Sequence, residues 1–303
     1  MAFSRAQELK ELVPGLNAIF GIEYKRYENE HTEIFDTEKS DRAFEEEVLF
    51  TGFGAAPTKQ EGAGVQYDEA AESWVARYSH ETVALAFAIT EEAMEDNLYD
   101  KLAPRLTKML ARSMNHTKQV KAANVLNNAF DSTNYKGGDG VSLCSTSHPL
   151  YGGGTLANRP STDADLSETS LEDATIAIEG WTDDRGIPQS ILVKKLIIPR
   201  QLKYVAERLL ESDLRVSTGD NDINALKRMR AVPGGFAINH RLSDPDAWFL
   251  KTDCSDGLKH FQRVNMTTKM EGDFETGNVR YKARERYSFG WSDYRGVWGT
   301  TGA

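Results

Sequence analysis

The sequence has very few cysteines and no long apolar segment. Only Cys144 and Cys254 occur among 303 residues, too few for a disulfide framework and without the CxxC spacing of a zinc or redox motif. A reducing compartment is the natural expectation. No run of about 18 apolar residues is present, and the first residues lack the apolar centre of a secretion signal. We therefore expect a soluble protein that does not enter a membrane.

The signature motifs of several enzyme classes are also missing. The sequence contains no P-loop, no dinucleotide-binding glycine pattern after a strand, no HExxH and no GxSxG, so these nucleotide, zincin and hydrolase sites lack their minimum residues. One alternative stays open, a soluble enzyme with Cys144 and His148 in the glycine-rich segment 137–154. We interpret His148 as a loop residue before Pro149, because no orienting Asn or Asp is evident in the sequence. We expect no catalytic residues, no cofactor and no metal.

An excess of acidic residues restricts the possible partners. There are 36 basic and 46 acidic residues, a formal net charge of −10, which argues against a protein that grips a phosphate backbone over a broad surface. Hydrophobic residues make up 40% and aromatic residues 10% of the chain, enough for a substantial core. Contact with nucleic acid could then only be local.

The N-terminal region combines a short helix pattern with an acidic stretch. Residues 4–13 predict an amphipathic helix that ends at Pro14-Gly15. Residues 25–47 carry too little apolar matter to pack unaided. This arm is either a solvated tail or a strap along a basic partner, and the acidic residues assigned to such contacts are Glu28, Glu30 and Glu33.

A glycine-rich segment followed by an alternating strand lacks an evident cover. Residues 51–73 are polar with several glycines, whereas Val83, Leu85, Phe87 and Ile89 alternate with small residues at the period of a half-buried strand. A β-excursion with so few core residues is marginal alone. We expect it to lie on a neighbouring copy of the same protein.

A long helix is predicted from about residue 91 to 131. Its apolar positions recur every four residues, and Thr90 before two glutamates suits its start. Pro104 implies a kink or a restart. Beside the apolar stripe runs a basic stripe, a candidate partner for the acidic arm of another subunit, formed by Lys101, Arg105, Lys108 and Arg112.

The remaining chain predicts an α/β unit and a long final strand. Helices are expected at 170–181, 200–210 and 221–229, and strands at 191–198, 236–239, 248–252 and 261–265. Residues 279–291 alternate apolar and basic side chains, the cleanest β pattern in the chain. Glu285 falls on the apolar face, so its carboxylate must be paired or have a perturbed pKa.

This order of elements resembles the HK97 fold of tailed-phage major capsid proteins. An acidic arm, a β-ribbon loop, a long spine helix, an α/β domain and returning strands follow one another. The strings STSHPL, SLEDATIAIEGWTDDRGIP, LIIPRQLKYVAERLL and YKARERYSFGWSDYRGVWG are similar to the Mu-like major head subunit family. The resemblance spans about residues 80–299.

The resemblance implies an α+β fold and a division of labour along the chain. Residues 1–46 would form the N-arm, 47–90 an extended β-hairpin E-loop, 91–164 with 263–303 the P-domain, and 165–262 the A-domain. The implied function is a major capsid protein whose pentamers and hexamers tile an icosahedral virion shell around double-stranded DNA, without sequence-specific binding. The implied partners are a portal, a separate scaffold and a cement or decoration protein, with assembly in the host cytoplasm.

Two further possibilities come with the fold. An encapsulin-type nanocompartment has the same fold but encloses proteins, and it is the alternative function. Some relatives join subunits through a Lys–Asn isopeptide bond promoted by a buried Glu. The corresponding candidates here are Lys59 in the ribbon, Asn278 before the last strand and Glu285.

Overall fold

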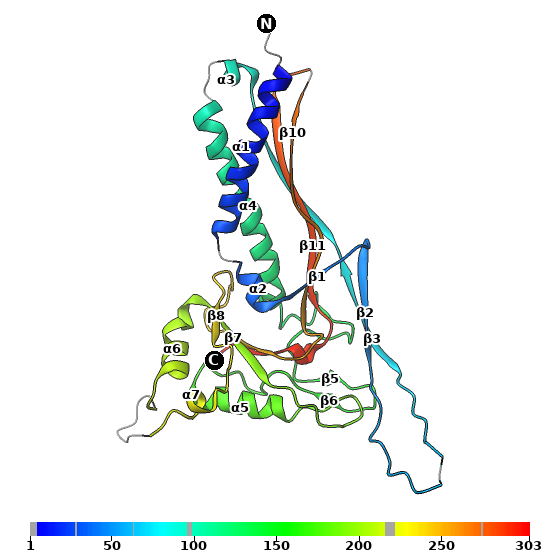
Figure 1. Cartoon of the computed structure of the whole chain (residues 1–303). Helices are drawn as coiled ribbons and strands as arrows, with labels where there is room; N and C mark the ends of the chain where they lie inside the picture. The colour runs from blue at the N-terminus through cyan, green and yellow to red at the C-terminus, as the bar shows by residue number, and fades with distance from the viewer. Residues whose placement is uncertain (1–4, 28, 63, 96–98, 216–221, 274) are drawn as a thin grey trace.

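A computed structural model describes residues 5–27, 29–62, 64–95, 99–215, 222–273 and 275–303. The chain forms a long stalk, an α/β body at the stalk's base and a hairpin that projects beyond the body (Figure 1). The predicted α+β architecture is therefore confirmed.

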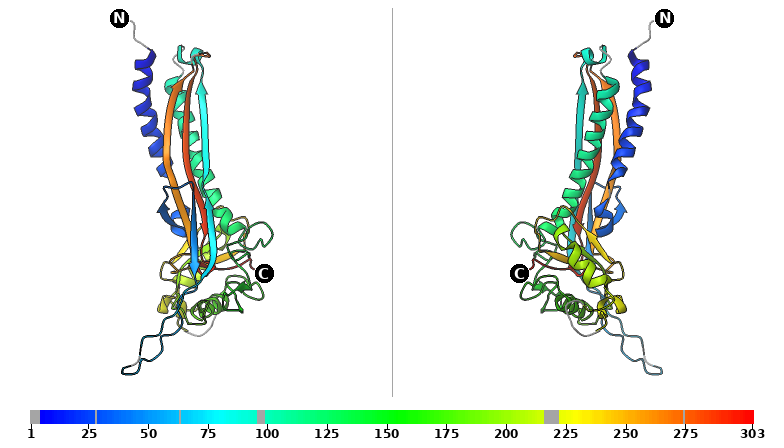
Figure 2. Two further views of the ribbon diagram at one scale, coloured as in Figure 1. Left: turned by 90° about the vertical axis from the view of Figure 1, so that its right-hand side faces the viewer. Right: turned by 90° about the vertical axis from the view of Figure 1, so that its left-hand side faces the viewer.

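The stalk is a four-stranded sheet with helices on one face. The strand order is β1-β10-β11-β4, in which β10, β11 and β4 are antiparallel and β1 runs parallel to β10. Figure 2 shows α4 and α1 along the same side of this sheet. The elements are β1 (Asp36–Lys39), β4 (Glu81–Ile89), β10 (Leu258–Gly272), β11 (Val279–Trp291), α1 (Arg5–Arg26) and α4 (Tyr99–Asn127).

Alternation along β11 determines which face of the sheet is covered. Tyr281 and Ala283 are fully buried against Leu110 and Met114 of α4, while the intervening basic residues are exposed. The period-two pattern of the sequence thus predicted both faces correctly from Val279 to Glu285. It fails near the end of the strand, where Ser288, expected on the outer face, is buried. The covered face also holds Glu285, as expected.

The first helix is longer than predicted, because it continues through Pro14 to Arg26. A proline inside a helix removes one backbone hydrogen bond. Beyond it, Leu16 and Phe20 are each 3% exposed and pack into the stalk core. Burial of two large apolar side chains, at about 1.5–3 kcal/mol each, offsets that loss.

The expectation that the acidic arm cannot pack on its own subunit was wrong. The arm forms α2 (Glu30–Ile34) and then β1. Ile34 and Phe35 are each 1% exposed and enter a core with Leu126 and Leu143. Two adjacent apolar residues within the acidic stretch are enough to anchor it, because each buries nearly its whole side chain.

The long helix was predicted correctly in type but not in its bounds. A short α3 (Glu91–Glu95) begins after Thr90, whose Oγ1 accepts a hydrogen bond from the backbone N–H of Ala93 at 3.4 Å. Residues 96–98 lie outside the described residues, and α4 ends at Asn127 rather than near 131. At 1.5 Å per residue, α4 is about 44 Å long.

The α/β body is built around a second sheet, with strand order β12-β9-β7-β8. Trp248 and Leu196 are fully buried between this sheet and the helices. The body comprises β5 (His148–Pro149), β6 (Thr155–Leu156), α5 (Glu168–Glu179), β7 (Val193–Ile198), η1 (Arg200–Leu202), α6 (Lys203–Glu211), α7 (Ala225–Met229), β8 (Phe236–Ile238), β9 (Trp248–Thr252), η2 (Tyr294–Gly296) and β12 (Val297–Thr300).

The strand pairing crosses two of the expected domain boundaries. Residues 297–300, assigned to the P-domain, form β12 beside β9 of the body. Residues 258–262, assigned to the A-domain, begin β10 of the stalk. The domain limits taken from the resemblance stay predictions.

Candidate functional site

The hairpin of β2 (Phe44–Phe50) and β3 (Glu72–Ser79) carries a loop that the rest of its own chain hardly covers. No helix or strand is present in residues 51–62 and 64–71, and the loop extends away from the body in Figure 1. Phe53, Val65 and Tyr67 are 62%, 69% and 97% exposed. Large apolar side chains gathered on one exposed loop are typical of an interaction site.

The base of this loop is fixed to the body by one aspartate. The carboxylate of Asp68 accepts hydrogen bonds from the backbone N–H of Gly54 at 2.7 Å and from the Arg185 guanidinium at 2.8 Å. The Gly54 hydrogen bond, followed by that of Arg185, lowers the pKa of Asp68. The Gly54–Asp68 contact thus closes the base of the loop, with Val65 and Tyr67 beyond it and Phe53 next to it.

The uncovered face of the stalk sheet is basic. Arg280, Lys282 and Arg284 of β11 are exposed, and Lys282 lies directly opposite exposed Lys269 of β10. Like charges at opposite positions of an antiparallel pair are destabilising. Arg280 lies opposite exposed Glu271 and forms an ion pair with Asp273. On the other side of β11, β4 presents the exposed side chains of Thr82, Ala84, Ala86 and Ala88 on this face.

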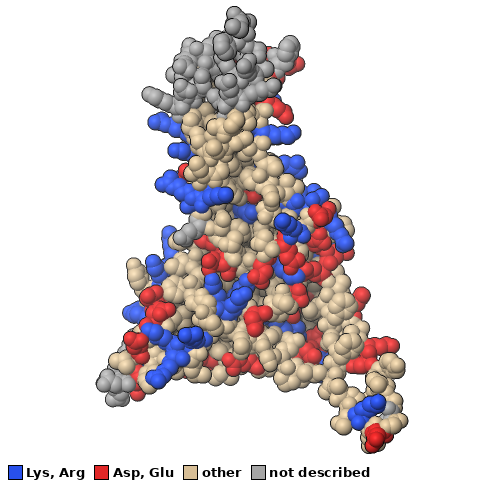
Figure 3. Space-filling model, in the orientation of Figure 1, with Lys and Arg blue, Asp and Glu red and all other residues tan. Residues whose placement is uncertain are grey.

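The outer side of α4 is basic and partly apolar. Arg105, Lys108 and Arg112 are exposed, as are Leu102 at 41% and Met109 at 66%. In Figure 3 the stalk shows mostly Lys and Arg at its margins, whereas both signs are mixed over the body. Met109 is therefore a surface residue of the helix. The side chain of Lys101 lies outside the described part.

The acidic residues of the arm find partners within their own chain instead of on α4. Glu30 contacts Arg241 at 2.8 Å and His240 at 2.9 Å, and Glu33 pairs with Lys195. Glu28 lies outside the described residues. A contact between the arm and the α4 stripe of another subunit stays a prediction, for which Glu30 and Glu33 would have to exchange partners.

Glu285 is the centre of a buried polar cluster under α4. Its side chain is fully buried, its Oε2 lies 3.5 Å from Lys118 Nζ, and Tyr24 Oη of α1 donates to Oε2 at 3.2 Å. Burial raises the pKa of Glu285, against the opposing effect of Lys118, and burial lowers the pKa of Lys118. The expected pairing and pKa shift of Glu285 are confirmed.

The three isopeptide candidates are not brought together within one subunit. Lys59 lies in the exposed hairpin loop, and Asn278 lies in the turn between β10 and β11, at the opposite end of the molecule in Figure 1. Glu285 is enclosed between β11, α1 and α4. A crosslink would therefore need another subunit to supply Lys59, and it stays a prediction.

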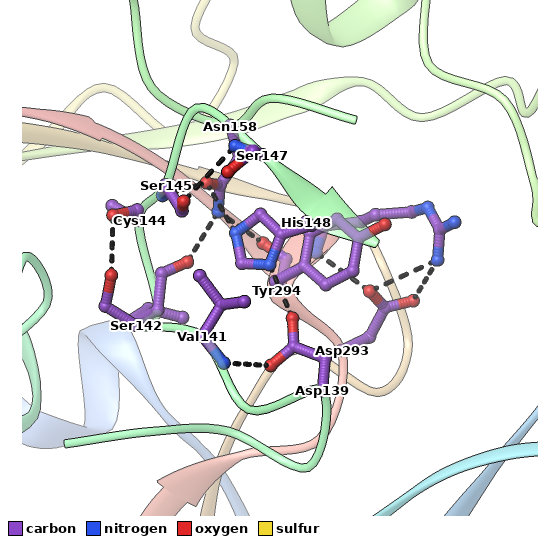
Figure 4. Close-up of polar contacts among 12 residues, drawn as sticks. Asp139, Val141, Ser142, Cys144, Ser145, Ser147, His148, Asn158, Asp293 and Tyr294 are labelled. Carbon is purple, nitrogen blue, oxygen red and sulfur yellow. Dashed lines mark hydrogen bonds and ion pairs between the residues drawn. The ribbon is translucent and has the colours of Figure 1, made fainter. Parts of the chain in front are cut away.

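His148, the other catalytic candidate, belongs to a buried network. Its Nδ1 lies 2.6 Å from Asp139 Oδ2, its Nε2 lies 3.0 Å from Asn158 Oδ1, and its ring stacks on Tyr294 at 3.8 Å (Figure 4). Asp139 and Asn158 are the orienting residues that sequence reasoning missed. No short motif connects them, because the fold brings them to His148 from separate loop positions.

The hydrogen bonds around His148 and Asn158 hold the glycine-rich loop in place and do not form a catalytic site. Asn158 Nδ2 donates to the carbonyl oxygens of Leu143, Tyr294 and Val297 at 2.7–3.1 Å. His148 is fully buried. Burial raises the pKa of the Cys144 thiol, which disfavours the thiolate that nucleophilic catalysis needs. These contacts give His148 and Asn158 a structural role, joining the glycine-rich loop to the η2–β12 segment.

The sequence matches the family model described as phage capsid protein over residues 74–299. The chain belongs to this phage capsid protein family. No curated protein matches the sequence. As a phage capsid protein it associates with copies of itself to form an icosahedral shell, and its place is the virion capsid. Among the described residues, no helix is both long and apolar enough to cross a membrane.

Solved structures show the same fold at low sequence identity. The capsid of a native GTA particle has a TM-score of 0.55 at 11% identity, with 89% of each chain covered. A phage-related protein from Bordetella bronchiseptica RB50 has a TM-score of 0.51 at 14% identity, covering 93% of this chain and 95% of that chain. The procapsid of bacteriophage JBD30 has 0.51 and 14%, covering 99% and 77% respectively. The HK97-like fold is thereby confirmed.

Proposed function

We propose that the chain is the major head subunit of a Mu-like tailed phage, and that its shell of pentamers and hexamers encloses double-stranded DNA. The observation that carries the assembly part is the projecting hairpin loop, which exposes Phe53, Val65 and Tyr67 on its own subunit. A neighbouring copy would bury these side chains. A separate scaffold, a portal and a decoration protein complete the proposed set of partners, and assembly takes place in the host cytoplasm.

Charge complementarity indicates which face of the neighbouring subunit the hairpin loop contacts. Glu61, Glu69 and Glu72 of the hairpin are exposed, and the open face of the stalk sheet carries the opposed lysines Lys269 and Lys282. An acidic loop on this face would relieve their repulsion. Each such contact contributes little, but it repeats around a closed shell.

Electron microscopy of the expressed protein tests the assembly part. We expect closed shells from the wild-type chain, supplemented with a scaffold if the chain alone does not close. Changing Lys282 and Arg284 to Glu should abolish closure, because the sheet face then repels the loop. The matched control is Lys136→Glu, an exposed lysine in a loop outside the stalk sheet, which should assemble normally.

A compensating change makes this test specific. Glu69→Lys together with Glu72→Lys should restore closure in the Lys282→Glu, Arg284→Glu background. Normal shells from the Lys282→Glu, Arg284→Glu variant without the compensating changes would contradict the proposed docking face. A protein that never forms shells with any phage partner would contradict the assembly function itself.

The cargo separates the proposed function from a protein-filled nanocompartment. Shells purified from phage-producing cells should contain nuclease-protected double-stranded DNA and carry a portal at one vertex. Shells that contain a discrete enzyme and no nucleic acid would refute the DNA-enclosing role while leaving self-assembly intact.

A further inference from the structure

Three buried histidines meet one segment of the arm, residues 29–40, called here the arm segment. His31 belongs to it. His260 of β10 places Nδ1 3.1 Å from Thr37 Oγ1, and His80 places Nε2 2.8 Å from Ser40 Oγ. The three histidines are 5%, 1% and 9% exposed. Histidine therefore contacts the arm segment in its helix, in its strand and at its end.

The hydrogen bonds of His31 require a neutral ring. Its backbone N–H donates to Gln119 Oε1 at 3.0 Å, so the other amide atom of Gln119 is the NH₂ group. That group lies 2.9 Å from His31 Nδ1 and donates to it. A donor facing Nδ1 leaves no room for a proton on this nitrogen. Protonation of His31 would break the contact that holds α2 to α4.

His260 is also placed where a positive charge is unfavourable. Its ring stacks on Phe289 at 4.4 Å and meets the edge of His31 at 5.2 Å. Its Nε2 is buried without a hydrogen-bond partner among the described residues. Burial, then Lys118, lowers the pKa of both rings, to about 4 for His31 and about 3 for His260.

Other charged groups near the rings do not remove this penalty. Glu285 lies close but is engaged by Lys118 and Tyr24, and Tyr287 meets His260 only ring to ring at 6.0 Å. Burial lowers the pKa of His80 too, as does the positive charge of Arg286, whereas Glu45 raises it. Ser40 Oγ donates to Glu45, so His80 Nε2 donates to Ser40, and this contact does not require a neutral ring.

The remaining partners of the arm segment are lysines that form ion pairs with its carboxylates. Glu33 pairs with Lys195, Asp36 with Lys251 and Glu38 with Lys259. Glu30 is held by Arg241 and by exposed His240. Among the partners of the arm segment, His31 and His260 are the groups whose buried contacts are opposed by protonation.

We propose that the arm segment is an acid-sensitive latch, released from the stalk when His31 and His260 take up protons while the rest of the subunit stays folded. Release uncovers Ile34 and Phe35 and frees the edge of β10, because β1 is the outer strand of the stalk sheet. Acid would thus change which surfaces a subunit offers to its neighbours. This inference does not depend on the proposed cargo.

The sign follows from the lowered pKa values. Above pH 6.5 the rings are neutral in both states, and the latch has its full stability. As the pH falls below 6.5, the released arm binds protons that the latched arm does not, so release is favoured. At pH 5 this amounts to about 30-fold for His31, which leaves the stalk with the arm. His260 remains on β10 near Lys118 and adds a smaller factor in the same direction.

Hydrogen–deuterium exchange of the full chain tests the latch. Peptides from residues 29–40 should lose protection between pH 7.5 and 5, after correction for the intrinsic pH dependence of exchange. Peptides from α5 should not. An arm segment as protected at pH 5 as at pH 7.5 would overturn the proposal.

Variants assign the effect to the rings. His31→Asn and His260→Asn each retain an acceptor near the position of Nδ1 but cannot be protonated. His31→Asn should reduce the release at pH 5 by about 30-fold, and His260→Asn should reduce it by a smaller factor. His116→Asn, an exposed histidine on α4, is the control and should behave as wild type. An unchanged pH response in the His31 and His260 variants would refute the assignment.

The wild-type protein gives a second readout should these variants fold poorly. The opening constant of the arm segment should rise with about one to one and a half protons per event between pH 6.5 and 5. An uptake below about half a proton contradicts the latch.

Discussion

Replacing Lys118 by Met tests how the stalk tolerates the buried carboxylate of Glu285. The substitution keeps the apolar stem of the lysine but removes the ammonium group 3.5 Å from Glu285 Oε2. Glu285 is then left fully buried with Tyr24 as its hydrogen-bond donor. A fully buried carboxylate without a positively charged partner takes up a proton instead of remaining charged.

The pKa of an unperturbed glutamate sets an upper limit on the free-energy cost of leaving Glu285 unpaired. An ordinary glutamate has a pKa of 4.5, and each unit of pH above it costs about 1.4 kcal/mol for protonation. We therefore expect Lys118→Met to lower the free energy of unfolding by about 3–4 kcal/mol at pH 7.5 and by less than about 1 kcal/mol at pH 5. The sign follows because the raised pKa of Glu285 makes the folded state bind the extra proton. Easier protonation of His31 and His260 without Lys118 acts in the same direction.

Urea unfolding of the dissociated subunit at the two pH values measures this difference. Lys121→Met is the matched control, because Lys121 lies one turn further along α4 and its pair with Glu81 is partly exposed. Its cost should stay below about 1 kcal/mol at either pH. Adding Glu285→Gln to Lys118→Met should recover most of the loss at pH 7.5. Equal costs of Lys118→Met at pH 7.5 and 5, or a cost no greater than that of the control, would refute this reasoning.

Three further changes probe the core, the loop network and the hairpin. Leu126 of α4 is fully buried, so Leu126→Ala should lower the free energy of unfolding, measured with denaturant, by about 2–5 kcal/mol. Leu102 is 41% exposed, so Leu102→Ala should lower it only slightly. Equal losses for the two variants would contradict the packing described. Asn158→Leu removes the donor shared by three backbone carbonyls, so thermal unfolding should show a loss of about 3 kcal/mol or more, and an unchanged melting temperature would argue against the network. Phe53→Ser with Tyr67→Ser should leave subunit stability within about 0.5 kcal/mol but prevent shell closure in electron micrographs; normal closure would exclude these side chains from the interface.

Local periodicity was enough to predict the elements that pack by one face. The alternation in 279–291 indicated both faces of β11 from Val279 to Glu285 and placed Glu285 on the apolar one. The type of α4 followed from its four-residue repeat, but its end at Asn127 did not. There, the Asn127 side chain binds the backbone of Arg241 and Ser243 from the distant body, and no local pattern reveals such contacts.

Features created by long-range packing could not be predicted. Ile34 and Phe35 are a short apolar pair within an acidic stretch, and only the cavity formed by α4 and the body makes them core residues. Pro14 is tolerated inside α1 because the helix beyond it packs on the stalk. The histidine contacts with the arm segment join residues more than 200 positions apart in the case of Thr37 and His260. Their polar side chains carry no periodic signal.

The position of β12 has a consequence for synthesis of the subunit. Residues 297–300 supply a strand of the body sheet, Trp298 packs against Trp248, and the strand is almost completely buried. On the ribosome, strands β7, β8 and β9 emerge first, and the edge of β9 that pairs with β12 stays unpaired until β12 is made. The body can close only after residue 300 has left the exit tunnel, so nascent chains stay incompetent to join a growing particle until translation has passed that point.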